Sequence, residues 1–390
     1  MKKRVLSFFG TRPEAIKMAP VVRALKEDRS IDARVVVSAQ HRDMLDQVLD
    51  VFGISVDGDL DIMRPRQTLF DVTTAVLTRF DKALDKHKPD LVLVHGDTTT
   101  SFAGALSAFY KRIPVGHVEA GLRTHDLGRP FPEEANRRLT DALAVLHFAP
   151  TVEARKNLLS ENTAKDGIFI TGNTVIDALL QAAEAHRAVR NSVVAKVLDG
   201  VRENGDRLIL LTAHRRENFG APFNEAFAAI RELSVSREFS DVQWIYPVHP
   251  NPNVKAAVAR HLRGCTNIHL VNPLDYGDLV AVLGASTLVL TDSGGLQEEA
   301  PALGKPVLVL RDVTERPEAV RAGTVKLVGT NKTRIIRETR RLLTDRAHYR
   351  RMSAALNPYG DGKAAARIAQ AVAWFFDHKR KRPAPFEVSR

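Results

Sequence analysis

The chain has very little cysteine: among its 390 residues only Cys265 carries a thiol. A single cysteine excludes a disulfide framework and a cysteine-based metal site. The sequence also lacks an HExxH motif, the helical zinc signature of many hydrolases. We therefore expect no metal site.

Long apolar runs are also missing, since no run approaches the ~20 residues that a membrane span needs. The first residues, MKKRVLSFFGTRPE, pass directly from a short apolar strand into a helix start. They contain neither the apolar core nor the small-residue cleavage site of a signal peptide. These absences predict a cytoplasmic protein that does not use a membrane.

Acidic residues are in the minority: 46 of them stand against 57 basic residues, which gives a net charge of +11. A basic balance suits anionic partners, but no RNP strand or zinc-finger spacing indicates a nucleic-acid module. Much of the excess lies on predicted helix faces and in the run HKRKR at 378–382, which we interpret as a solvated tail. The partner we expect is a small anionic substrate and no nucleic acid.

Short β-branched runs alternate with segments of helical spacing, and the alternation restarts at about residue 207. A chain of 390 residues is too long for one typical core. We predict an α/β protein of two doubly wound, Rossmann-like domains whose sheet edges face each other across a deep cleft. The domains predicted are residues 1–171 with a helix at about 360–380 that packs back on them, residues 172–359, and a basic tail at 381–390.

Residues 288–310, LVLTDSGGLQEEAPALGKPVLVL, have the pattern of a βαβ unit. Gly294 and Gly295 let the backbone approach a ligand, Ser293 can cap the helix, and a helix N-terminus attracts an anion. We interpret this turn as a diphosphate site, with Glu299 on a ribose. The alternative is an ordinary tight turn with an N-cap serine.

The first βα turn, at Gly10, lacks the second and third glycines of the dinucleotide fingerprint, so we expect no NAD. It carries Arg12 and Lys17, two cations that suit a diphosphate, although each alone could be an ordinary surface charge. In the second half of the chain, His214 and Arg215 could serve the same anion. A structural role for His214 is the alternative.

Three consecutive connections in the first half carry an acid from a strand toward the next helix: Asp97, Glu119 and Glu133. Asp97 could instead cap a helix, and Glu133 could simply favour a helix dipole. Because the carboxyl ends of parallel strands meet at one edge of a sheet, three acids there favour a site. Such carboxylates could move protons to and from a sugar whose diphosphate is the leaving group.

Ten motifs follow one another over nearly the whole chain. They read GTRPEAIKMAP, SAQHRDMLDQVL, VHGDTTTS, PVGHVEAGLRT, PEEANRRLTD, ITGNTVIDAL, TAHRRENFG, YPVHPNPNV, LTDSGGLQEEAPALGKPVLVLRDVTERPE and NPYGDG. Together they resemble the non-hydrolysing UDP-N-acetylglucosamine 2-epimerases. The resemblance implies the GT-B architecture, interconversion of UDP-N-acetylglucosamine and UDP-N-acetylmannosamine without a cofactor, and a homodimer. It implies anti elimination of UDP through an oxocarbenium-like state to 2-acetamidoglucal, then return of UDP after protonation on the other face of C2.

The resemblance also implies roles for individual residues. The family's catalytic residues correspond to Asp97, Glu119, Glu133 and His214. Its UDP contacts correspond to Arg12, Ser293, Gly294, Gly295 and Glu299. We add Lys17 and His214 to the predicted UDP contacts, because the sequence pattern already indicates that they could bind a diphosphate. A pocket that binds a second UDP-N-acetylglucosamine as an allosteric activator corresponds to Gln40, Arg66, Arg215 and His249.

Other functions stay open at this stage. A hydrolysing 2-epimerase would release UDP and free N-acetylmannosamine, but it would not need the activator pocket. A GT-B glycosyltransferase would not need three acids, and a nucleotide-sugar sensor would need none. We expect the epimerised product to supply N-acetylmannosamine-type precursors for cell-surface polysaccharide.

Overall fold

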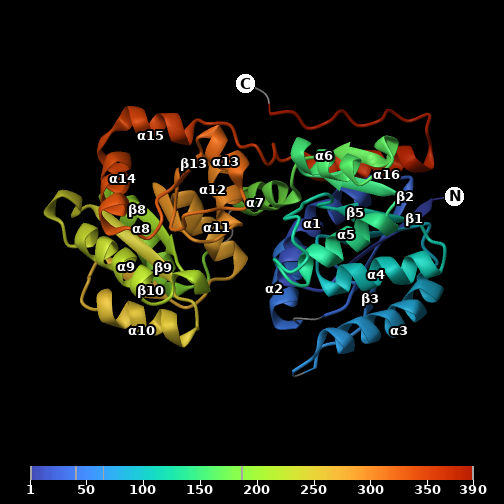
Figure 1. Cartoon of the computed structure of the whole chain (residues 1–390), viewed down its shortest axis with the longest axis horizontal. Helices are drawn as coiled ribbons and strands as arrows, with labels where there is room; N and C mark the ends of the chain where they lie inside the picture. The colour runs from blue at the N-terminus through green and yellow to red at the C-terminus, as the bar shows by residue number, and fades with distance from the viewer. Residues whose placement is uncertain (1, 40–41, 65, 186–187, 389–390) are drawn as a thin grey trace. The chain divides into compact units, whose positions relative to one another are not determined.

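The chain forms two compact units in a computed structural model, which describes residues 2–39, 42–64, 66–185 and 188–388 (Figure 1). Unit 1 extends to Gln181 and includes Tyr359–Glu387, whereas unit 2 holds Ala182–Pro358 and Val388. Each unit is therefore built from more than one stretch of the chain. Among the described residues, no helix is long and apolar enough to cross a membrane.

Unit 1 is built on a seven-stranded parallel sheet of order β3-β2-β1-β4-β5-β6-β7. The order runs outward in both directions from β1 and β4, which is the doubly wound arrangement that the sequence predicts. Central strands such as β4 are buried along their whole length, as expected when helices cover both faces of a sheet. The strands are β1 (Lys3–Phe9), β2 (Ile31–Val37), β3 (Gly58–Asp59), β4 (Leu91–His95), β5 (Val115–Val118), β6 (Leu146–Ala149) and β7 (Ile168–Ile170).

Helices pack against this sheet, as α1 does against β1 and α4 against β4. Phe8 of β1 stacks on Phe80 of α3 with ring centroids 3.9 Å apart, which fixes one helix to the sheet. The helices are α1 (Arg12–Glu27), α2 (Arg42–Phe52), α3 (Leu69–His87), α4 (Thr99–Tyr110), α5 (Glu133–Leu143), α6 (Val152–Ser160), η1 (Lys165–Gly167), α7 (Thr174–Glu184, which ends in unit 2) and α16 (Ala364–Phe376).

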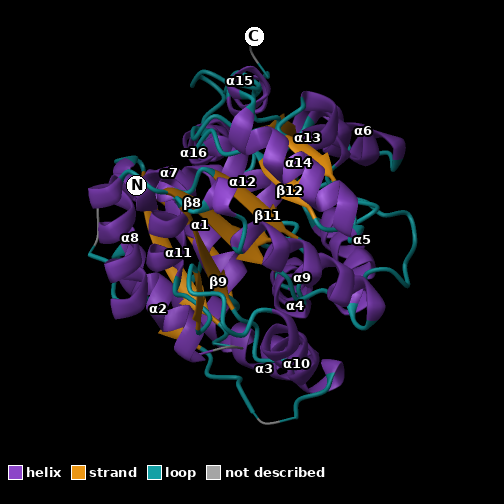
Figure 2. Cartoon of the chain, turned by 90° about the vertical axis from the view of Figure 1, so that its left-hand side faces the viewer, coloured by secondary structure: helices purple, strands orange, loops and turns teal. Residues whose placement is uncertain are grey.

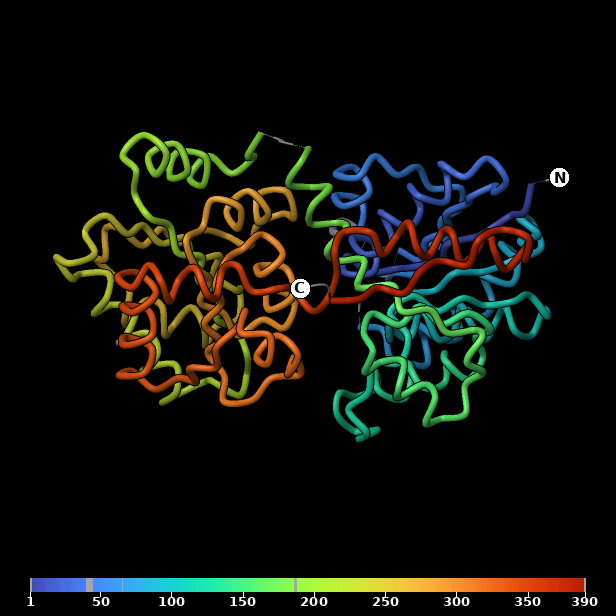
Figure 3. Tube along the Cα trace, turned by 90° about the horizontal axis from the view of Figure 1, so that it is seen from above, coloured from blue at the N-terminus to red at the C-terminus, as the bar shows by residue number. Residues whose placement is uncertain are grey.

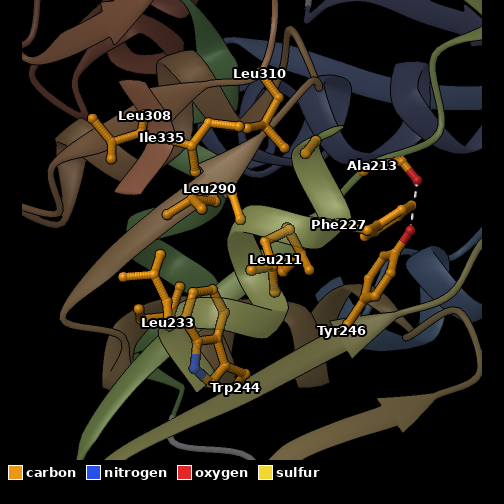
Figure 4. Packing of buried hydrophobic residues seen from close by; sticks show 14 of the residues in the cluster. Leu211, Ala213, Phe227, Leu233, Trp244, Tyr246, Leu290, Leu308, Leu310 and Ile335 are labelled. Carbon is orange, nitrogen blue, oxygen red and sulfur yellow. Dashed lines mark hydrogen bonds between the residues drawn. The ribbon is translucent and has the colours of Figure 1, made fainter. Parts of the chain in front are cut away.

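Unit 2 repeats the pattern with a six-stranded parallel sheet of order β10-β9-β8-β11-β12-β13. Figure 4 shows Trp244, Leu211 and Leu290 of this sheet packed with Phe227 and Leu233. The strands are β8 (Arg207–Thr212), β9 (Val242–Pro247), β10 (Ile268–Val271), β11 (Leu288–Thr291), β12 (Val307–Val309) and β13 (Val325–Leu327). The prediction of two doubly wound sheets is confirmed.

The helices of unit 2 cover its sheet in the same way (Figure 2). They are α8 (Ser192–Asn204), η2 (Arg216–Asn218), α9 (Ala221–Ser234), η3 (Arg237–Phe239), α10 (Pro252–His261), α11 (Tyr276–Ala285), α12 (Leu296–Ala302), α13 (Pro317–Ala322), α14 (Lys332–Thr344) and α15 (Arg346–Ser353).

The last helix, α16, belongs to unit 1, where it packs against α1 (Figure 3). Its start is tied to α7, because the Asp177 carboxylate accepts the N–H groups of Ala364 at 3.2 Å and Ala365 at 2.8 Å. The segment after it also docks on unit 1. The Arg382 guanidinium lies 4.4 Å from the Phe169 ring centroid, so this part of the basic tail contacts the domain.

Candidate active site

The carboxyl ends of the unit 1 strands bring acids and cations to one edge of the sheet. β4 ends at His95 and is followed by Asp97, while Glu119 directly follows β5. β4 and β5 are hydrogen-bonded neighbours, so these residues leave adjacent strands. Glu133 begins α5, which packs on α4. The prediction of three consecutive connections is wrong, because no strand or helix separates Glu119 from Glu133: both belong to the connection from β5 to α5.

Glu119 is the most enclosed of these acids. Its carboxylate pairs with the Lys17 ammonium and lies 3.0 Å from His95 Nε2, and only 9% of its side chain is exposed. Burial raises the pKa of the Glu119 carboxyl, but Lys17 and His95 outweigh burial and hold that pKa well below its usual value. Glu119 is thus an anion near neutral pH. Its backbone is left-handed, with φ of 67°, which is unusual for a residue other than glycine.

A buried network fixes the loop that carries Glu119. The Asp141 carboxylate lies 2.6 Å from His117 Nδ1, accepts the Gly121 N–H at 3.2 Å and pairs with Arg123 at 2.7 Å. Burial opposes the charge, yet His117 and Arg123 lower the pKa of Asp141 to about 2. His117 Nε2 in turn lies 2.7 Å from the carbonyl of Gly96, so the two acid-bearing loops are tied together.

Asp97 pairs with Arg137 of α5, and its carbonyl accepts a hydrogen bond from Asn136 Nδ2 at 3.0 Å. About a third of its side chain stays exposed. The interpretation of Asp97 as a helix cap is wrong, because Thr98 is the N-cap of α4 and accepts the Ser101 N–H at 3.1 Å. Asp97 is therefore available for another role.

The two acids at the start of α5 differ in their surroundings. Glu134 is fully buried and accepts the N–H groups of Thr124 at 3.0 Å and His125 at 3.1 Å, so it holds the preceding loop. Glu133 is half-buried, and its Oε2 has no hydrogen-bond partner among the described residues. An unsatisfied buried oxygen suits contact with a ligand.

Two main-chain N–H groups of the first βα turn already have an acceptor within the chain. Glu14 Oε2 accepts the N–H groups of Gly10 at 3.0 Å and Thr11 at 2.7 Å. A carboxylate therefore occupies the helix N-terminus that a dinucleotide would use. Arg12 is the first residue of α1 and is half-buried.

In unit 2, Asp292 organises the loop that follows β8. It is fully buried, and its Oδ2 accepts the N–H groups of His214 at 2.7 Å and Arg215 at 2.8 Å. His214 Nδ1 lies 3.4 Å from Asp292 Oδ1, and the ring stacks on His249 at 5.4 Å. Burial lowers the pKa of His214 and outweighs the pull of Asp292, so the imidazole is neutral near pH 7.

The glycine turn follows β11, as the sequence predicts, but Ser293 does not cap the helix. Gly295 is the N-cap of α12 and no side chain caps it. The prediction of a serine cap is wrong because the helix begins only at Leu296, too late for Ser293 to be its N-cap. Glu299 is buried, and its Oε1 accepts the hydroxyl of Tyr276 at 3.2 Å.

The residues predicted for the activator pocket lie in different elements. Gln40 is outside the described residues, and Arg66 is an exposed residue of unit 1. In unit 2, Arg215 Nε donates to the carbonyl of Asp292 at 3.3 Å. His249 is exposed, and its Nδ1 accepts the Asn251 N–H at 3.2 Å.

Sequence reasoning missed His95 and Arg137, which pair with two of the three acids. His95 belongs to the motif VHGD, and its position at the end of a buried strand could have indicated that it lies near the acids. Arg137 stands four residues after Glu133, one helical turn along the same face of α5.

The chain is similar to one family of known proteins over most of its length. Residues 23–373 match the family model described as UDP-N-acetylglucosamine 2-epimerase. The UDP-N-acetylglucosamine 2-epimerase of Bacillus subtilis is 54% identical over 387 residues, which cover 99% of each chain. That of Escherichia coli K12 is 54% identical over 372 residues, which cover 95% of this chain and 98% of the relative.

The fold agrees with solved structures of the same kind. The UDP-GlcNAc 2-epimerase from Neisseria meningitidis, solved bound to UDP-GlcNAc, has 48% identity and a TM-score of 0.83. The superposed region covers 95% of this chain and 99% of that one. With its two doubly wound sheets in the GT-B fold, the chain belongs to the UDP-N-acetylglucosamine 2-epimerase family.

Proposed function

We propose that the protein interconverts UDP-N-acetylglucosamine and UDP-N-acetylmannosamine without hydrolysis. The observation that carries this proposal is the set of three acids at one sheet edge of unit 1: Asp97, Glu119 and Glu133. A protein that only binds a nucleotide sugar has no need for them. The match to epimerases over nearly the whole chain supports the same function.

Other residues are proposed to bind the nucleotide. Ser293, Gly294 and Gly295 offer a hydroxyl and main-chain N–H groups to the diphosphate, and Glu299 accepts from the ribose hydroxyls. Arg12 adds a positive charge, and the neutral His214 adds a ring N–H donor. These groups stabilise the charge that collects on the diphosphate as it leaves.

The reaction needs no cofactor in this proposal. The bond between C1 and the diphosphate oxygen breaks, and its electron pair leaves with UDP. An ionised carboxylate then takes the C2 proton, and the C–H electron pair forms the C1–C2 double bond of 2-acetamidoglucal. A protonated carboxylate delivers a proton to the other face of C2, and UDP returns to C1.

The proposed regulation and assembly of the protein are based on its resemblance to the family. A second UDP-N-acetylglucosamine is proposed to activate the enzyme through Gln40, Arg66, Arg215 and His249, and the active form is proposed to be a homodimer. The product would supply N-acetylmannosamine-type precursors for cell-surface polysaccharide.

Product identity tests the proposal. Purified protein incubated with UDP-N-acetylglucosamine is followed by proton NMR of the anomeric signals. We expect a stable mixture of two UDP-sugars from either starting sugar. Accumulation of free N-acetylmannosamine with UDP would instead identify a hydrolysing enzyme.

A further inference from the structure

The partners of the three acids of unit 1 differ. Glu119 is held by two groups from separate elements, the Lys17 ammonium of α1 and the His95 imidazole at the end of β4. Asp97 has Arg137 and remains partly exposed, whereas Glu133 keeps one buried oxygen without a hydrogen-bond partner in the described structure. Glu119 therefore has the most fixed charge and orientation.

We propose that Lys17 and His95 are positioning residues that hold Glu119 as an oriented, ionised carboxylate for the reaction at C2. This inference rests on the proposed function. It assigns Lys17 to Glu119, with which its ammonium pairs, and leaves the predicted contact of Lys17 with UDP to the affinity measurement below.

Burial strengthens the electrostatic interactions of Glu119 with Lys17 and His95. Only 19% of the Lys17 side chain, 9% of Glu119 and 4% of His95 are exposed, so solvent screens their interactions weakly. Removing the ammonium would leave Glu119 enclosed without its compensating charge. The carboxyl would then keep its proton to a higher pH. The Lys17 charge, and not the general polarity of the site, would set the protonation state of Glu119.

The chemistry explains why a fixed anion is useful. A carboxylate with a lowered pKa is a weak base, and it would remove a proton from an ordinary C–H bond poorly. An oxocarbenium-like state is positively charged and makes the C2 proton strongly acidic, so a weak base is sufficient. The same anion also stabilises the positive charge as it develops. Glu119 is accordingly the acceptor of the C2 proton. Asp97 or Glu133 then donates a proton to the other face of C2.

Lys17→Met is the first test, because methionine keeps the length of the side chain without its charge. Lys26→Met is the matched control on the same helix, where the ammonium donates to Ser55 Oγ at 3.3 Å. We expect exchange at C2 to fall about ten- to a hundredfold in Lys17→Met. The acid limb of its pH profile should move up by at least about one pH unit, because the pKa of Glu119 rises. The affinity for UDP should change less than about threefold, and Lys26→Met should resemble wild type.

His95 is tested by two substitutions of different hydrogen-bonding capacity. His95 Nε2 lies 3.0 Å from the Glu119 carboxylate; in His95→Gln an amide N–H can donate to Glu119, whereas in His95→Leu nothing can. We expect exchange at C2 to fall about tenfold or more in His95→Leu and to be largely retained in His95→Gln. Equal losses in both variants, with unchanged pH profiles, would show that His95 only packs and would overturn its part of the proposal.

A measurement without turnover separates this inference from the proposed function. Carboxyl-labelled glutamate, with the Glu119 signal assigned by its loss in Glu119→Gln, gives the pKa of Glu119 by carbon-13 NMR. We expect a depressed pKa in wild type that rises in Lys17→Met, even if the wild-type protein exchanged no proton at C2. An unperturbed Glu119, or a Lys17→Met variant with weaker UDP binding and an unshifted pKa, would overturn the inference and leave the epimerase proposal standing.

Discussion

The two sheets of the molecule have the same strand order, apart from a seventh strand in unit 1, but present different chemistry at their carboxyl edges. In unit 1 the acids project from the strand ends and pair with side chains, as Glu119 does with Lys17 and Asp97 with Arg137. In unit 2 the corresponding carboxylate, Asp292, turns inward and accepts main-chain N–H groups. One edge thus carries ionisable side chains, and the other carries an ordered loop and a glycine turn.

This difference shows that topology alone does not determine function. A doubly wound sheet gathers the loops that follow its strands, and the residues at those positions decide what the edge can do. The side chains of unit 1 are suited to proton transfer. The turn of unit 2, which includes Gly294 and Gly295, is suited to holding an anion.

The sharpest way to test this division is to remove an acid from unit 1. Glu133→Gln keeps the shape of the side chain but removes a proton-transfer group. We expect turnover to fall by ~10²- to 10⁴-fold while the affinity for UDP changes little. Steady-state kinetics and calorimetry with UDP measure the two quantities. Normal turnover would mean that Glu133 only stabilises the start of α5. Proton transfer would then depend on Asp97 and Glu119.

Asp177 provides the next test, since it is a buried carboxylate of unit 1 that accepts two main-chain N–H groups, as Asp292 does in unit 2. Burial raises the pKa of Asp177 from 3.8 to about 6, and its hydrogen bonds offset burial only in part. Between pH 4 and 6 the unfolded chain releases this proton and the folded chain keeps it. Stability should therefore fall as the pH rises, by about 3 kcal/mol in all from this group.

Asp177→Asn removes this titration. Denaturant unfolding at pH 4, 5, 6 and 7 should show a difference between wild type and variant that changes across this interval and is constant above about pH 7. A difference that is the same at every pH would mean that Asp177 does not titrate between pH 4 and 6.

Asp292→Asn tests the inward carboxylate of unit 2. One oxygen of Asp292 accepts two N–H groups and the other faces His214 Nδ1. The amide replaces one acceptor with a donor, so we expect a loss of about 1–3 kcal/mol in the stability of unit 2. Hydrogen exchange should localise the loss to the loop at 213–220. A loss confined to turnover, with normal protection of this loop, would place Asp292 in the chemistry instead.

Ser293→Ala should have the smallest effect. A hydroxyl that contacts a phosphate does so in the ground state and the transition state alike, so its loss weakens binding without slowing the chemical step. We expect UDP affinity to fall about tenfold, near the lower limit for a hydrogen bond to a charged group. Titration calorimetry measures this, with turnover at saturation as the companion value. A large fall in turnover at unchanged affinity would break the contrast between the two units.

The sequence predicts the fold well because strand and helix periodicity are local signals. The alternation of buried strands and helices is enough to predict two doubly wound sheets, and the acids at the strand ends can be read directly. Pairings across the chain are different. Lys17 and Glu119 are separated by 102 residues, so nothing local indicates that they meet. The prediction of the start of α12 is wrong for a related reason, because a two-residue shift of a helix start changes which residue caps it.

One measurement tests the central claim most directly: incubation of the protein with UDP-N-acetylglucosamine in heavy water. The account predicts deuterium at C2 of both UDP-sugars, at a rate that matches epimerisation and falls in Glu133→Gln. Folded protein that binds UDP-N-acetylglucosamine but incorporates no deuterium at C2 would contradict it.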